Sequence, residues 1–244
     1  MSEEPREKSG EILLSVVIPA YNEENRIGLT LPTVVSFLKA QKFVSEVVFV
    51  DDGSHDKTVS VAEKCLREQP HQIILNKQNQ GKGSAVKKGM LAAKGVYRLF
   101  TDADLSTPIE TVIDFIEDLK SNCDVAVGSR ALRDSDVAVR QSIWRESMGR
   151  IYNLLARMFA FHNISDSQCG FKCFKGEAAE TLFSLQKLQR FSFDAEIIYL
   201  AQKQGYKVLE KPVTWRNSPQ SRVNVIKDSL NMFVDLIRIR WIHR

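Results

Sequence analysis

The stretch VYRLFTDAD, residues 96–104, joins a strand-like run to two carboxylates, Asp102 and Asp104, that are separated by one residue. In an extended backbone, residues i and i+2 point to the same side, so both carboxylates share a face if the strand persists to its end. Two like charges held close together are costly unless a cation joins them, and hard oxygen ligands suit Mg²⁺ or Mn²⁺. The stretch therefore predicts a metal site that holds a further ligand such as a diphosphate. The alternative is that one Asp caps the following helix while the other is solvated.

Similar apolar runs of strand length occur along the first half of the chain and alternate with helical patterns. The strand-like runs are residues 12–18, 46–50, 72–75, 96–101 and 124–127, and Pro19 is expected to stop the first of them. Apolar residues with helical spacing cover residues 27–40, 56–68, 84–93 and 109–119. This alternation predicts a doubly wound α/β sheet, in which ligands bind at the carboxyl ends of the strands. Polar clusters at 21–23, 51–53 and 102–104 are expected to converge there.

The second half of the chain follows a different pattern. It predicts helices at 141–161, 191–204 and 223–242 and a strand at 207–215, with no linker rich in Pro, Gly or Ser. We therefore expect a flexible tail over residues 1–10, one domain over 11–222, and an amphipathic C-terminal helix over 223–244.

Composition excludes several classes of protein. The 244 residues are 43% hydrophobic, which argues against global disorder, and the net charge of +4 does not suggest a nucleic-acid binder. The four cysteines match no zinc-binding spacing, so reduced thiols in a cytoplasmic protein are the simplest interpretation. The N-terminus lacks the apolar core of a signal peptide, and no apolar stretch approaches the roughly 20 residues of a spanning helix. We expect a protein that does not span a membrane.

Four blocks in fixed order resemble the family 2 glycosyltransferases: VIPAYNEE at 17–24, VDDGS at 50–54, DAD at 102–104 and GSR at 128–130. The resemblance covers about residues 12–216. QCGFK at 168–172 and FDAE at 193–196 are similar to the dolichyl-phosphate β-glucosyltransferase branch. The resemblance implies the GT-A fold, a Rossmann-like mixed sheet flanked by helices, and UDP-glucose as the donor. The neighbouring mannosyltransferase branch uses GDP-mannose.

The resemblance also implies which residues hold the nucleoside of the donor. They lie at the first two strand ends: Pro19, Ala20, Tyr21, Glu23, Val50 and Asp52. Asp52 is expected to approach the base. Considered without the resemblance, Tyr21 could be a packed surface aromatic, and Asp51 could cap a turn while Ser54 or Asp56 caps the next helix.

The metal and the donor phosphates have their own candidate residues. By resemblance Asp104 contacts the ion directly, while Asp102, with Ala103 between them, helps to hold ion and sugar. Some relatives have Gln where this chain has Ser106, a weaker ligand, so the third protein contact is open. The Gly-Lys-Gly turn at 81–83 opens a helix whose N–H groups could face an anion. Lys82 is either a binding residue or a plain solvated lysine.

Basic and acidic residues further along the chain complete the predicted site. The guanidinium of Arg130 can clamp a phosphate through two hydrogen bonds. Arg216 and Arg222 are six residues apart, a spacing at which the mannosyl branch places basic residues on the donor phosphates. Asp194 is the remaining candidate, either as a catalytic base or as a binder of sugar hydroxyls. Glu196 cannot share its helix face, since residues i and i+2 diverge, and is expected to be structural.

These residues predict inverting, metal-dependent transfer of a hexose from a nucleotide sugar, with UDP-glucose favoured, to a polyprenyl or dolichyl phosphate. A lipid phosphate is already anionic and needs no general base, whereas a hydroxyl acceptor would need one. Three alternatives stay open: a GDP-mannose-dependent polyprenyl-phosphate mannosyltransferase, transfer to a glycan or protein hydroxyl, and a nucleotide-sugar-binding protein without activity. The terminal IRIRWIHR, residues 237–244, suits peripheral contact with the cytoplasmic face of a membrane, or else is a solvated basic helix end.

Overall fold

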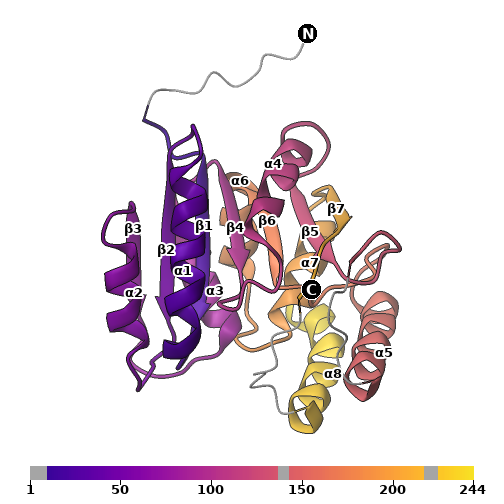
Figure 1. Ribbon diagram of the computed structural model, residues 1–244. Coiled ribbons are helices and arrows are strands. Elements are labelled where there is room, and N and C mark those ends of the chain that lie inside the picture. The colour runs from indigo at the N-terminus through magenta and orange to yellow at the C-terminus, as the bar shows by residue number, and fades with distance from the viewer. Residues whose placement is uncertain (1–9, 137–142, 217–224) are drawn as a thin grey trace.

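The computed structural model describes residues 10–136, 143–216 and 225–244. Seven strands form one mixed sheet in the order β3-β2-β1-β4-β6-β5-β7, as Figure 1 shows. Their bounds are β1 Leu14–Ala20, β2 Ser45–Asp51, β3 His71–Leu75, β4 Tyr97–Thr101, β5 Val125–Ser129, β6 Phe171–Lys175 and β7 Val208–Pro212. The expected α/β sheet is confirmed, and it belongs to a single domain.

The first strand corrects one expectation, because β1 does not stop at Pro19 but continues to Ala20. Pro19 lies opposite Val50 of β2, whereas the pairing of β1 with β4 ends at Val17. At Pro19 the strand thus has a paired neighbour on one side only, and a residue without an N–H is tolerated in such a place.

The sixth strand was not predicted. β6 lies between β4 and β5 and is antiparallel to both, with Phe171 opposite Thr101. Because β4 and β5 run the other way, β6 begins where they end. The segment that leads into β6 is thereby delivered to the carboxyl edge of the sheet, beside Asp102.

Helices cover both faces of the sheet. On one face lie α1 Glu24–Lys39, α2 Thr58–Leu66, the 3₁₀ turn Ile109–Thr111 and α4 Val112–Ser121. On the other lie α3 Lys82–Ala92, α5 Ile143–Phe159, α6 Gly176–Leu185, α7 Phe193–Lys203 and α8 Val225–Ile242. Alternate residues of β1 supply the two cores: Val16 and Ile18 face the first, and Val17 faces the second. Of these helices, α6 was not predicted.

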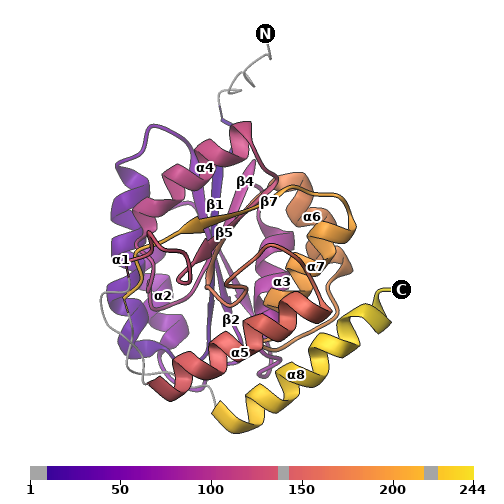
Figure 2. The ribbon, with the colours of Figure 1, turned by 90° about the vertical axis from the view of Figure 1, so that its right-hand side faces the viewer.

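Helices α5 and α8 lie side by side at the end of the molecule where β4 and β5 finish (Figures 1 and 2). In the described part of the chain, no helix is both long enough and apolar enough to cross a bilayer. The helix predicted at 141–161 corresponds to α5, which ends two residues earlier than expected, at Phe159, and the helix predicted at 223–242 corresponds to α8. The first two residues of each predicted helix lie outside the described ranges.

Candidate active site

The first two strand ends are tied together by their loops, as the sheet topology predicts. Asn22 follows β1 with a φ of 52°, in the left-handed region that Asn tolerates better than most residues. Its backbone N–H donates to Ser54 Oγ at 2.7 Å, and its side-chain oxygen accepts from the N–H of His55 at 2.8 Å. The loops after β1 and β2 therefore form one rigid rim at the carboxyl edge.

Asp51 caps the turn after β2, as one interpretation of the sequence anticipated. Its Oδ2 accepts hydrogen bonds from the N–H groups of Gly53 at 3.1 Å and Ser54 at 2.9 Å. The turn needs glycine, because Gly53 has a φ of 77° and a Cβ there would lie 2.6 Å from the backbone of Gln78.

Asp52 makes three hydrogen bonds within the protein, while its expected approach to the nucleobase stays a prediction. Its Oδ1 accepts from Asn76 Nδ2 at 2.7 Å and the N–H of Gln80 at 3.0 Å, while its Oδ2 accepts from the N–H of Gly81 at 2.8 Å. Asp52 is buried. Its carboxylate fixes the loop that leads into α3, so it positions Lys82.

The remaining residues of the predicted nucleoside site lie along the same rim. Ala20 and Val50 are buried, and Val50 belongs to the core packed on α3. Tyr21 and Glu23 are partly exposed, and Glu23 pairs with Arg26 at 3.0 Å. Pro19 is buried within β1.

The acidic pair lies at the end of β4 next to a lysine. Lys82 Nζ is 2.6 Å from Asp102 Oδ1, and Asp104 Oδ1 accepts from the N–H of Ser106 at 3.0 Å. Among the described residues, no three or more His, Cys, Asp or Glu side chains gather as a metal cluster. Two carboxylates suit Mg²⁺ or Mn²⁺, which keep waters and take substrate phosphate oxygens as further ligands. The ammonium beside Asp102 shows that this position already favours a cation, so the residues present fit the ion.

Lys82 is held by the negative charge around it. Burial acts to lower the pKa of Lys82, but the nearby carboxylates of Asp102, Asp194 and Asp104 raise it to about 12. The ammonium also lies 5.6 Å from the ring centre of Phe100 and 5.9 Å from that of Phe193. Lys82 is thus a permanently charged member of the acidic cluster, and the structure does not support the alternative of a plain solvated lysine.

The position of the Asp102 carboxylate depends on the neighbouring Gly170. The N–H of Asp102 donates to the carbonyl of Gly170 at 3.2 Å, and a Cβ on Gly170 would lie 1.9 Å from Asp102 Oδ2. Only glycine leaves room for this carboxylate at the start of β6.

Gly170→Ala is therefore expected to displace Asp102 and to lower kcat/KM by about 10- to 100-fold, in line with small misplacements of catalytic groups. The free energy of unfolding should fall by only about 1–3 kcal/mol, as for other overpacked sites. Steady-state kinetics and urea unfolding measure the two effects. Gly149→Ala in α5, where a Cβ would meet nothing within 4 Å, is the matched control. Full activity in Gly170→Ala would contradict this role.

Asp194 is buried at the start of α7 and is bound by a lysine whose role sequence reasoning missed. Lys172 Nζ lies 2.5 Å from Asp194 Oδ1 and donates to the carbonyl of Cys169 at 2.6 Å. Lys172 is 0% exposed and Asp194 2% exposed. Burial raises the pKa of Asp194, while Lys172 and Lys82 act against this rise. In the sequence, Lys172 stands out only as part of QCGFK, because neither of the two lysines in this strand of five residues carries a periodic signal that would reveal its partner.

Glu196 is structural, as expected. Its two oxygens accept from the N–H groups of Lys187 and Leu188, each at 2.9 Å, and its Oε1 also lies 2.6 Å from His243 Nε2. This fully buried carboxylate joins the loop before α7 to the end of α8.

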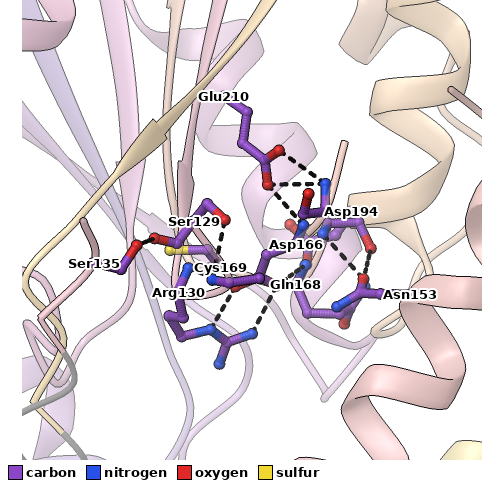
Figure 3. Close-up of polar contacts among 12 residues, drawn as sticks. Ser129, Arg130, Ser135, Asn153, Asp166, Gln168, Cys169, Asp194 and Glu210 are labelled. Atoms are coloured by element: carbon purple, nitrogen blue, oxygen red, sulfur yellow. Dashed lines mark hydrogen bonds and ion pairs between the residues drawn. The ribbon is translucent and has the colours of Figure 1, made fainter. Parts of the chain in front are cut away.

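Arg130 lies at the end of β5 and forms a two-pronged ion pair with Asp166 (Figure 3). Its Nε is 2.6 Å from Asp166 Oδ2 and its Nη2 is 2.9 Å from Oδ1. The guanidinium also lies 5.5 Å from the ring of Trp215. Two of its nitrogens are thus already bound, so the predicted contact with a phosphate would have to use the remaining edge of the guanidinium.

The 165–167 segment that carries Asp166 is itself anchored. Glu210 of β7 accepts from the N–H groups of Ser165 and Asp166, and Asn153 of α5 accepts from Ser167 at 2.9–3.1 Å (Figure 3). Asp166 had no signal in the sequence.

Asp166 is expected to make the free energy of unfolding depend on pH in the acidic range. Its burial acts to raise the pKa, but Arg130 overcomes this and lowers it from 3.8 to about 2. A carboxyl group whose pKa is lowered on folding stabilises the native state above its unfolded pKa and loses that contribution as the pH falls toward the folded value. We expect about 2 kcal/mol of unfolding free energy to disappear between about pH 5 and pH 2 because of this group. Asp166→Asn should lack this part of the decline in urea unfolding across that range. An unchanged pH profile in the variant would contradict the assignment.

Of the two last arginines of the predicted site, the structure describes only Arg216. Arg216 is exposed, and its N–H donates to the carbonyl of Ser106 at 2.8 Å, which places it next to the acidic turn. Arg222 lies outside the described residues.

Known proteins match the chain throughout. The family model described as Glycosyl transferase family 2 matches residues 15–183. The chain is 36% identical to a dolichyl-phosphate beta-glucosyltransferase of Dictyostelium discoideum, over 94% of this chain and 74% of that protein. It is 37% identical to the protein of the same name from Saccharomyces cerevisiae, over 94% and 75%. Among solved structures, it is similar to glucosyl-3-phosphoglycerate synthase from Mycobacterium tuberculosis in complex with Mn²⁺, UDP-glucose and phosphoglyceric acid. That likeness has a TM-score of 0.66 and 17% identity and covers 95% of this chain and 79% of that one; it concerns the fold.

Proposed function

The chain belongs to glycosyl transferase family 2 and is a glycosyltransferase; from this premise we propose that it transfers glucose from UDP-glucose to a polyprenyl phosphate, with inversion and with Mg²⁺ or Mn²⁺. Its similarity to two dolichyl-phosphate beta-glucosyltransferases supports the donor sugar and the acceptor. The observation that carries the proposal is the meeting of the Asp102–Asp104 pair with Lys82 and Arg130 at one edge of the sheet.

Each side chain has a task in this reaction. Asp102 and Asp104 would hold the ion, which supplies positive charge against the departing diphosphate. Lys82, which is paired with Asp102, and the outer edge of Arg130, which Asp166 holds in place, are the protein's own cations for the same oxygens. Tyr21 and Glu23, on the rim after β1, are proposed to bind the nucleoside. Arg216 and Arg222 remain proposed contacts to the donor phosphates.

Asp194 has a role that depends on the acceptor. A phosphate oxygen is anionic near neutral pH and attacks without a general base. Asp194 is buried and paired with Lys172, so we propose that it balances the charge of Lys82, and that it orients sugar hydroxyls once donor binding uncovers its carboxylate. With a hydroxyl acceptor, the same carboxylate would instead have to accept a proton.

A lipid acceptor calls for a surface that meets a bilayer, and α5 and α8 present one. Their outward sides carry exposed apolar residues at helical spacing: Ile151, Leu154, Met158, Phe233, Val234, Ile237 and Trp241. A groove of about 930 Å³ lies along α8, against α7 and the last residue of α5, with Arg238, Arg240 and Arg244 among its lining residues. Apolar side chains interleaved with arginines match an anionic bilayer surface. We propose peripheral binding of this face to the cytoplasmic leaflet.

The reaction is tested by incubating the protein with Mn²⁺ or Mg²⁺, a panel of UDP- and GDP-sugars and a polyprenyl phosphate. The expected result is a lipid-linked glucose formed from UDP-glucose in the presence of metal. A product formed only from GDP-mannose would replace the proposed donor. Transfer to a glycan alone, or donor binding without any product, would overturn the proposed acceptor.

Membrane binding is tested by co-sedimentation with vesicles of pure phosphatidylcholine and with vesicles that contain phosphatidylserine. Trp241→Ser should weaken binding to the anionic vesicles, because the Trp241 side chain is 71% exposed and belongs to the proposed face. Leu29→Ser, at a residue that is 77% exposed on α1, is the matched control. Equal binding of both variants, or none by the wild type, would contradict the proposed surface.

A further inference from the structure

We propose that Lys82 is an exchangeable counterion: it holds the cation's place on Asp102 and leaves that carboxylate when a divalent ion and a nucleoside diphosphate bind together. This inference rests on the proposed metal-dependent function. It goes beyond that function by explaining why the ion and the donor would bind cooperatively. The ion pair of 2.6 Å between Lys82 Nζ and Asp102 Oδ1 is the starting observation.

The backbone of Lys82 cannot supply the movement. Asp52 accepts hydrogen bonds from the residues just before it, and Gly81 has a φ of 103° at a place where an added Cβ would lie 2.6 Å from the carbonyl oxygen of Gln189. On the other side, a Cβ on Gly83 would lie 2.8 Å from Phe193 Cβ. The chain is thus clamped before and after Lys82, so only the long side chain is left to move.

The side chain and a divalent ion compete for the same carboxylate. One side of Asp102 is closed by Gly170, which lies against Oδ2, and Lys82 holds Oδ1. An ion on Asp102 would lie close to the ammonium, and like charges at such a separation repel each other. The ion alone must therefore displace Lys82 from its partner before it gains Asp102 as a ligand.

A nucleoside diphosphate changes this balance. Its oxygens would offer Lys82 a second anionic partner in place of Asp102. Lys82 then passes from Asp102 to the diphosphate, and Asp102 becomes free for the ion. Lys82 remains charged and paired in both states, with Asp194 and Asp104 still nearby.

The exchange is tested without turnover, by measuring free Mn²⁺ with electron paramagnetic resonance in titrations with and without UDP. In the wild type, Mn²⁺ should bind weakly alone and more tightly with UDP. Lys82→Gln should bind Mn²⁺ alone more tightly, by about 5- to 100-fold, the usual range for coupling between two ligands. The tightening that UDP causes should shrink by a similar factor.

Two further variants serve as controls. Lys82→Arg keeps the positive charge and should still bind Mn²⁺ alone weakly, whereas Lys42→Gln removes an exposed positive charge near the opposite edge of the sheet and should change nothing. If Lys82→Gln binds Mn²⁺ alone no more tightly than Lys42→Gln does, while UDP still promotes uptake in the wild type, the exchange is wrong and the metal site stands. If no protein takes up Mn²⁺ even with UDP, both are overturned.

Discussion

Asp104→Asn is expected to lower kcat/KM on the order of 10³-fold at saturating Mn²⁺, because the ion would lose its direct carboxylate ligand and the leaving diphosphate its main source of positive charge. The fold should be unaffected. The contact that Asp104 makes within the turn is the hydrogen bond from the N–H of Ser106, and the amide oxygen of Asn can still accept it. Steady-state kinetics with UDP-glucose and a polyprenyl phosphate measure the loss.

Two comparisons make this result specific. Asp104→Ala should lose the same activity and, in addition, about 1 kcal/mol of unfolding free energy, since the N–H of Ser106 loses its acceptor. Asp134→Asn, in the exposed segment after β5, removes an equal charge away from the turn and should retain activity. Metal-dependent turnover near the wild-type rate in Asp104→Asn would remove this residue from the site.

Lys172→Met is expected to lower the free energy of unfolding by about 3–5 kcal/mol, the usual cost of leaving one partner of a buried ion pair without the other. Asp194 is 2% exposed, and its Oδ1 lies 2.5 Å from the lysine ammonium, so water cannot replace that partner. Urea unfolding at neutral pH gives the value. The loss should shrink as the pH falls, because a protonated Asp194 no longer needs a counterion.

The double variant Lys172→Met/Asp194→Asn separates electrostatics from packing. Removing the stranded charge should restore most of the lost stability without restoring turnover, because Asp194 is proposed to orient the sugar. Lys175→Met is a control in β6, since its ion pair with Asp124 is partly exposed and such pairs contribute only about 0–1 kcal/mol. If the double variant is no more stable than Lys172→Met, the loss comes from packing and not from the charge of Asp194.

The parts of the fold that repeat a pattern were predictable. The runs at 46–50, 72–75 and 96–101 alternate with helical spacing, and all became the parallel strands β2, β3 and β4 with their crossover helices. Parallel strands end at the same edge of a sheet, so the sequence pattern alone predicts that Asp52 and Asp102 lie at the same edge. The strand β6 and the helix α6 have no place in that repeat and were missed. The strand β6 was also difficult to predict because the fully buried Lys172 interrupts its run of apolar residues.

Residue identity was easier to predict than the state of each side chain. Asp102, Asp104, Lys82 and Asp194 do lie in one electrostatic cluster. Asp52, however, holds a loop by three hydrogen bonds, and Arg130 is shared with Asp166. These pairings join residues about 30 positions apart through loops of irregular structure, where neither periodicity nor spacing carries information about the partner.

The reversed direction of β6 constrains the order in which the chain can assemble. β5 precedes β6 in the sequence, yet within the described sheet β5 pairs only with β6 and β7. During synthesis, the sheet formed by β1 to β4 therefore keeps an open edge at β4 until residues 171–175 emerge, and β5 must wait for them. Pairings over such long sequence separations form late and slowly. We expect nascent chains that end before β6 to expose the edge of β4 and to depend on chaperones, and donor-binding competence to arise only in the final folding step.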